Sequence, residues 1–144
     1  VYYQQAIYFQ SQKKIKEQKK ALENSIKMNP SQSYFHRDLG ILLYQQNKMD
    51  DARFQLEKAL NLNYADSRSH FNLGKIMHQM KDYEDAIQHF LSALDITPKF
   101  VECMVELADI KLKINKEKEA KEYYLKAKEI TPELQHIALE KIIN

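Results

Sequence analysis

The sequence has little of what tight turns, sheets and glycine-rich loops require. Its 144 residues include two glycines, three prolines and no tryptophan. So few turn-forming residues, beside abundant Lys, Glu, Gln, Leu and Ala, favour helices with short connections over a sheet. Two isolated glycines also exclude a glycine-rich phosphate-binding loop. We therefore expect an all-α protein.

Cysteine and long hydrophobic runs are scarce as well. Cys103 is the only cysteine, so no internal disulfide can form, which favours an intracellular, cytoplasmic location without identifying the compartment. Apolar runs such as 6–9 and 41–44 stop after four residues, so we expect neither a membrane span nor a signal peptide. The sequence begins at Val1 rather than Met, which is compatible with a piece of a longer chain.

Charge of one sign is also limited. The formal net charge is +2, too small to hold nucleic acid or a membrane surface by itself. Residues 1–30 are locally basic, with six lysines against two glutamates, and Lys13–Lys20 reads KKIKEQKK. This stretch could contact a polyanion, but a solvated helix face is the simpler interpretation, so we do not expect nucleic acid as a partner.

What the sequence does contain is a repeat with a period of 34 residues. Shifting the sequence by this interval superposes four sets of positions: Gly40, Gly74 and Ala108; Ala52, Ala86 and Ala120; Leu56, Phe90 and Tyr124; Ala59, Ala93 and Ala127. The three prolines, at positions 30, 98 and 132, share one phase of the period. A repeat of this length indicates a stack of similar structural units.

Within each period the apolar spacing is helical and breaks about halfway, which predicts two helices a unit. The predicted pairs are 1–11 with 15–28, 33–46 with 49–62, 67–80 with 82–96, and 101–114 with 117–130. The first pair is degenerate, because Gln18 and Ser25 replace the two alanines. The stretch PELQHIALEKIIN, from Pro132, is predicted to begin a further first helix.

The Leu-Gly pair, the following alanines, the bulky residue and the closing proline resemble the tetratricopeptide repeat (TPR) family. The resemblance implies a right-handed α-solenoid of antiparallel helix pairs, about four repeats plus a C-terminal helix. The expected single array has a degenerate repeat at 1–32, full repeats at 33–66, 67–100 and 101–134, and a further or capping helix at 135–144. The sequence departs from the family at Tyr2, His36, His70 and Met104, where Trp is preferred, and at Tyr64, where Pro is expected.

The recurring residues therefore serve packing, and no catalytic group stands out among the others. Gly40 and Gly74 let two helix backbones approach closely, while Leu56, Phe90 and Tyr124 fill the space between neighbouring pairs. His36 and His70 share one register and are expected to pack rather than bind metal. Cys103 has no partner base, so a nucleophile is not expected either. The sequence predicts no active site, metal or cofactor, hence a protein that is not an enzyme.

By the resemblance, function should lie on the first helix of each pair, facing a concave groove. The predicted partner-binding residues are Tyr34, Arg37, Ile41, Tyr44, Arg68, Phe71, Asn72, Lys75, His78, Glu102, Glu106 and Asp109, with Asp38, Val105 and Leu112 on the same faces. Their chemistry is aromatic and basic in the middle repeats and acidic toward the C-terminus. Exposed aromatic residues beside charges are typical of protein interfaces.

The predicted function is therefore a protein–protein interaction module or scaffold that binds a peptide, a helix or an assembly partner. One TPR subclass clamps the acidic C-terminus of heat-shock chaperones, and Asn72 matches that clamp. Glu102 and Glu106, however, stand where the clamp needs cations, so we do not expect this ligand. An alternative is the TPR region of a longer enzyme, such as a glycosyltransferase, where it would serve substrate selection. The sequence alone does not determine whether the partner binds the concave or the convex face.

Overall fold

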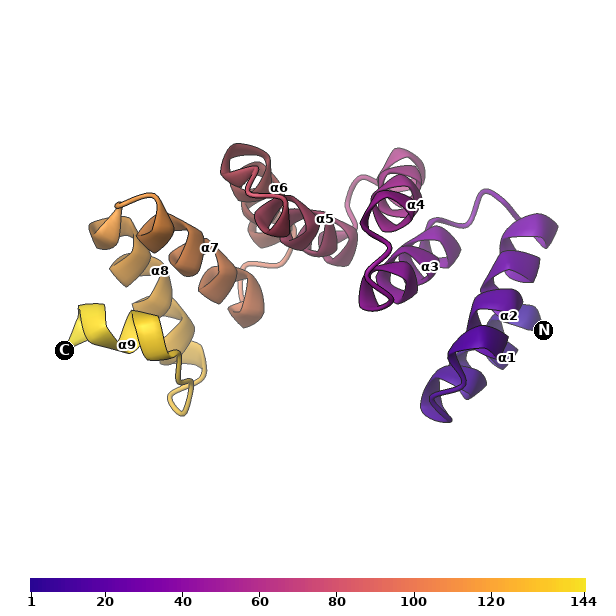
Figure 1. Ribbon diagram of the computed structural model, residues 1–144, viewed down its shortest axis with the longest axis horizontal. Helices are drawn as coiled ribbons and strands as arrows, with labels where there is room; N and C mark the ends of the chain where they lie inside the picture. Colours follow the sequence, from indigo (N-terminus) through magenta and orange to yellow (C-terminus); the bar gives the residue numbers. More distant parts are fainter. The chain divides into compact units, whose positions relative to one another are not determined.

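The computed structural model describes all 144 residues as nine α-helices with no strand (Figure 1). The helices are α1 (Tyr2–Ser11), α2 (Ile15–Met28), α3 (Ser33–Gln45), α4 (Met49–Leu62), α5 (Ser67–Gln79), α6 (Tyr83–Ile96), α7 (Val101–Lys113), α8 (Glu117–Ile130) and α9 (Ile137–Ile143). The all-α prediction and the four predicted helix pairs are confirmed, with boundaries that differ by no more than a residue.

The chain forms two compact units, residues 1–73 and 74–144. In the first unit α1 packs against α2, α3 against α4, and α2 against α3. In the second unit α7 packs against α8, and α6 against α7. Figure 1 shows the antiparallel course of the α3–α4 and α7–α8 pairs. Each unit therefore contains first helices and second helices in alternation.

One residue in the turn of every pair has a left-handed backbone. Lys13, Asn47, Lys81 and Asn115 have φ values of 54°, 60°, 63° and 60°, and they lie 34 residues apart. A residue in this conformation ends the first helix and directs the chain into the second. Asn adopts it more readily than Lys. The turns therefore follow the same period as the core.

The glycine of a repeat meets the large residue of its own helix pair, a contact that the sequence prediction did not specify. A Cβ atom at Gly40 would lie 2.7 Å from Leu56 Cγ, and one at Gly74 would lie 2.7 Å from Phe90 Cε1. Leu56, Phe90 and Tyr124 are fully buried, as are the alanines at 52, 59, 86, 93, 120 and 127. The glycines are thus needed because a bulky side chain occupies the space beside them.

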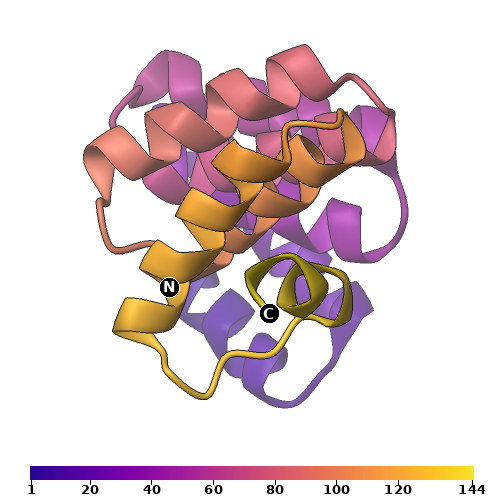
Figure 2. The same ribbon diagram turned by 90° about the vertical axis from the view of Figure 1, so that its left-hand side faces the viewer.

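The C-terminal helix starts later than expected. The sequence predicts a further or capping helix at 135–144, within the stretch that begins at Pro132, and α9 begins at Ile137 after a loop. His136 precedes this helix, and its Nδ1 accepts a hydrogen bond from the Leu139 backbone N–H at 3.4 Å, which caps the new start. Figure 2 shows α9 nearly end-on, beyond the loop that follows α8. It packs against both α7 and α8, and Leu139 joins a buried cluster with Ala108 and Tyr124.

Candidate partner-binding surfaces on the first helices

In the N-terminal unit, the first helices border a hollow of about 280 Å³, here called the N-terminal hollow. It is lined by Tyr3, Ile7 and Gln10 of α1, Gln18 of α2, Arg37, Asp38, Ile41, Leu42 and Gln45 of α3, and Arg68 of α5. Arg37, Ile41 and Arg68 are predicted partner-binding residues, and the structure brings them together. They come from α3 and from the first turn of α5 in the same unit.

The two arginines of this hollow differ in ion pairing and in solvent exposure. Arg37 Nε donates to Asp38 at 2.8 Å, and its Nη1 donates to Asp66 at 3.3 Å, so its charge is balanced inside the unit. Tyr3 Oη donates to the other Asp38 oxygen at 2.7 Å, and burial together with this bond raises the pKa of Tyr3 to about 12. Arg68, by contrast, is exposed. The cation most accessible to a partner here is therefore Arg68.

The remaining predicted residues of this unit are partly built into the fold. The Tyr34 ring packs edge-on against Tyr3, with centroids 4.9 Å apart. Tyr44 and Phe71 are half-buried. Asn72 is buried, and its Nδ2 donates to the Arg68 backbone carbonyl at 2.8 Å. One of its amide N–H groups is thus already used within α5, and a partner would meet mainly the aromatic side chains.

In the C-terminal unit, α7 borders a second hollow of about 480 Å³, here called the C-terminal hollow. It is lined by Val101, Glu102, Val105 and Glu106 of α7, and by Thr131 and Leu134 of the loop before α9. Glu102 and Glu106 are predicted partner-binding residues, and they lie one helical turn apart. The lining contains two carboxylates and no cation, unlike that of the N-terminal hollow.

A polar cluster adjoins Glu106. His78 Nδ1 lies 3.0 Å from Glu106 Oε2, and its Nε2 lies 3.5 Å from Asp109 Oδ2. Lys113 Nζ lies 2.6 Å from Asp109 and 2.9 Å from His78 Nε2. Three predicted residues, His78, Glu106 and Asp109, are therefore brought together, with Lys113 balancing one carboxylate. Lys75 is half-buried one turn before His78 on α5.

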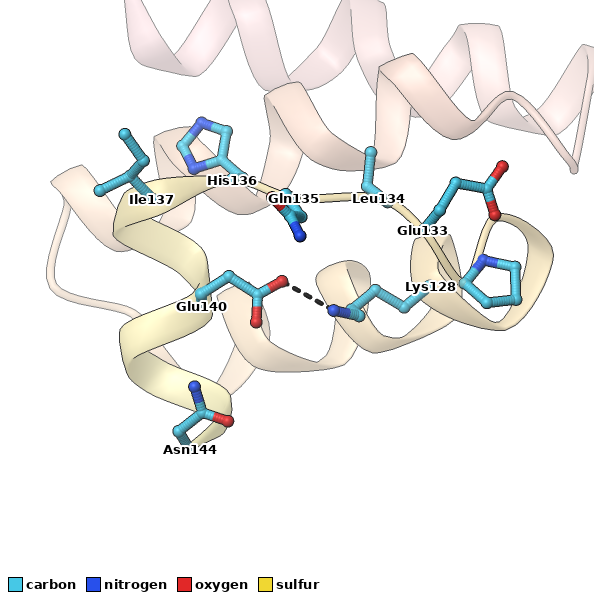
Figure 3. Close-up of a pocket in the computed structure, with 9 residues that line it drawn as sticks. Lys128, Glu133, Leu134, Gln135, His136, Ile137, Glu140 and Asn144 are labelled. Carbon is cyan, nitrogen blue, oxygen red and sulfur yellow. Dashed lines mark hydrogen bonds and ion pairs between the residues drawn. The ribbon is translucent and has the colours of Figure 1, made fainter.

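A third hollow, of about 370 Å³, lies at the junction of α8 and α9 (Figure 3). Lys128 Nζ contacts Glu140 Oε1 at 2.7 Å across it, and Tyr124 Oη donates to the same oxygen at 2.6 Å. Hydrogen bonds from Lys128 and Tyr124 lower the pKa of Glu140. Because these groups satisfy one another, we assign this junction to holding α9 in place.

The histidines and the cysteine singled out in the sequence are packing residues. His36 is buried between Gln55, 2.8 Å from its Nδ1, and the Pro30 carbonyl, 3.0 Å from its Nε2. His70 is buried with its Nε2 3.0 Å from the Tyr64 carbonyl, and burial lowers its pKa. Cys103 Sγ donates to the Phe90 carbonyl, and burial raises the pKa of the thiol to about 12. The packing role predicted for His36 and His70 is confirmed.

The 34-residue period and the arrangement of the pairs agree with comparisons to known families. Tetratricopeptide repeat models match residues 3–60, 67–100 and 101–134, which together span most of the chain. The chain belongs to the tetratricopeptide repeat family. TPR repeats are typically non-catalytic interaction scaffolds. No group of three or more His, Cys, Asp or Glu side chains is arranged to hold a metal ion, and no helix has the length and apolar content to cross a membrane.

Solved TPR structures resemble this chain throughout its length. PilF from Pseudomonas aeruginosa is 22% identical with a TM-score of 0.87, covering 99% of this chain and 66% of its own. MamA from Desulfovibrio magneticus RS-1 is 19% identical with a TM-score of 0.80, covering 94% and 76%. YrrB, described as a TPR protein with an unusual peptide-binding site, is 20% identical with a TM-score of 0.78, covering 92% and 68%. A search of curated proteins found no match. These likenesses establish the TPR fold.

Two residues that shape the surfaces were missed by the sequence prediction. Tyr3 lies 34 positions before Arg37, so extending the repeat register into the degenerate pair would have placed it on the first-helix face. Asp66 directly precedes α5, and its Oδ1 accepts from the backbone N–H groups of Arg68 and Ser69. An Asp just before a predicted helix is the usual signal for such a cap. Its second role, pairing with Arg37, has no local sequence signal.

Proposed function

We propose that this TPR chain is a protein-interaction module whose partner, a peptide or a helix, binds along the first helices. The observation that carries the proposal is the position of the N-terminal and C-terminal hollows. Both are bordered by first helices, and both are lined by residues that the repeat register marks as partner-facing: Arg37, Ile41, Arg68, Glu102 and Glu106.

The two hollows differ in the chemistry that they offer a partner. The N-terminal hollow combines the exposed Arg68 with Ile7 and Ile41, which suits an acidic or apolar side chain. The C-terminal hollow offers carboxylates. Glu102 and Glu106 would repel the acidic tail that the chaperone clamp binds, so we propose a different class of partner. Complementary charge sets specificity and association rate more than total affinity.

Selection from a random peptide library tests this function. A phage-displayed library of about twelve-residue peptides would be selected on the immobilised full chain. Recovered peptides would then be titrated against a first-helix variant, Arg68→Glu, Lys75→Glu and Glu102→Lys. We expect at least about a tenfold loss of affinity, or 1.4 kcal/mol, with unchanged helical content by circular dichroism.

The matched control carries the same charge changes on a second helix. Lys118→Glu, Lys121→Glu and Glu122→Lys alter three exposed residues of α8. Lys128 is unsuitable because it pairs with Glu140. We expect this control to bind the recovered peptides like the wild type. Loss of binding in the control but not in the first-helix variant would mean that the partner binds the second helices instead.

A further inference from the structure

The C-terminal hollow combines apolar walls with carboxylates that no lining cation balances. We propose that it binds a lysine or arginine side chain of the partner that stands next to an aliphatic residue. The inference rests on the proposed function, because it names the partner chemistry of one of the two hollows. It concerns only Val101, Glu102, Val105, Glu106 and Leu134 of the C-terminal unit.

The apolar walls are held in place by the core. Val105 and Leu134 pack against the buried cluster of Ala108, Tyr124 and Leu139. Their exposed surfaces therefore present a floor whose shape does not depend on a partner. Lysine and arginine have three- or four-carbon stems that cover apolar surface while the charged end stays near water. A volume of about 480 Å³ also leaves room for the aliphatic neighbour.

The charge of the hollow selects a cation. Glu102 is exposed and forms no ion pair. Glu106 uses Oε2 for its contact with His78, and its side chain is 30% exposed. The nearest lysine in the polar cluster, Lys113, lies 2.6 Å from Asp109 instead. A basic side chain would thus meet two carboxylates whose charge the lining does not balance.

The helix dipole alone does not account for this arrangement of carboxylates and apolar side chains. A carboxylate in the first turn of a helix is favoured by the helix dipole, which explains Glu102. It does not explain Glu106, which lies one turn further on, or the apolar floor between them. An acidic or phosphate-bearing occupant would be repelled. A wholly apolar occupant would remove water from the carboxylates without replacing its hydrogen bonds.

The test compares peptides recovered from the library on the wild-type full chain and on a Glu102→Lys, Glu106→Lys variant. We expect the peptides lost on the variant to be enriched in Lys or Arg beside Leu, Ile or Val. A synthetic peptide of this class should bind the double variant roughly tenfold more weakly. Glu102→Gln, which removes a charge from a side chain with no ion pair, should weaken binding about threefold. Raising the salt concentration should weaken wild-type binding more than variant binding.

The matched control is Asp95→Lys with Glu122→Lys, which makes the same charge change at two exposed residues outside the hollow. We expect this control to leave affinity unchanged. Recovered peptides that depend on Arg68 but are indifferent to Glu102 and Glu106 would overturn this inference and leave the proposed function standing. Failure to recover any peptide would overturn both.

Discussion

At the residue scale, the fold depends on pairing a small residue with a large one at each helix contact. Gly74 is buried against the Phe90 ring, three atoms of which would lie within 2.7–2.9 Å of an added Cβ. Gly40 has the same relation to Leu56, whose Cγ would lie at 2.7 Å and whose Cδ2 at 3.1 Å. Because protein interiors are close-packed, an extra methyl group must displace its neighbour.

Gly74→Ala should therefore destabilise the protein by up to about 2 kcal/mol. Alanine is the better helix former by about 1 kcal/mol, but overpacking against a buried ring costs about 1–3 kcal/mol. Chemical denaturation would measure the change. Gly74→Ala should cost less in a Phe90→Leu background than in the wild type, since a smaller side chain leaves room for the methyl group. A Gly74→Ala variant more stable than the wild type would contradict this account of the glycine.

At the element scale, helix ends are held by specific polar residues. Asp66 caps the start of α5 through the Arg68 and Ser69 N–H groups, and it also accepts from Ser69 Oγ at 3.1 Å and from Arg37. One carboxylate thus joins α3 to α5 within the N-terminal unit. Tyr124, Lys128 and Glu140 perform the corresponding task between α8 and α9.

Asp66→Ala is expected to destabilise the N-terminal unit by about 1–3 kcal/mol, because loss of a cap costs about 1 kcal/mol and Arg37 loses one partner. Asp66→Asn is the matched control, since its amide oxygen can still cap the helix. Thermal unfolding followed by circular dichroism should rank the proteins as wild type, Asn variant, Ala variant. Equal melting temperatures for the wild type and the Ala variant would show that this carboxylate is dispensable.

The α8–α9 junction should respond to alkaline pH. Burial and the hydrogen bond to Glu140 raise the pKa of Tyr124 from 10.0 to about 12. Since the folded state holds this proton more tightly, its contribution to stability is fully present below pH 10 and is lost as the pH rises toward 12. The melting temperature of the wild type should exceed that of Tyr124→Phe at pH 8, and the difference should shrink above pH 10. A melting-temperature difference that grows with pH would contradict a raised pKa of Tyr124 in the folded state.

The first helix pair should be the least protected from hydrogen exchange. Gln18 and Ser25 are buried where the other repeats have alanine, and Ala6 is the one buried residue of α1. Amide exchange in the free protein should therefore be faster in α1 and α2 than in α3 and α4. Slower exchange in α1 and α2 would show that their polar substitutions do not weaken packing.

At the scale of the whole molecule, the sequence predicts the repeat better than it predicts the surface. The period and the helix pairs follow from the spacing of small and large residues, which reflects packing and repeats every 34 positions. The start of α9 was misplaced because a single side chain, His136, caps it. The pairing of Arg37 with Asp66 was missed because it depends on side-chain geometry between residues 29 apart.

If a partner binds along the first helices, a hydrogen-exchange footprint should reveal it. Exchange would be measured for the full chain alone and with a saturating recovered peptide. We predict slower exchange on binding in α3, α5 and α7, centred on residues near Ile41, Arg68 and Glu102, and little change in α4, α6 and α8. Protection concentrated in α4, α6 and α8, with the first helices unchanged, would contradict the account.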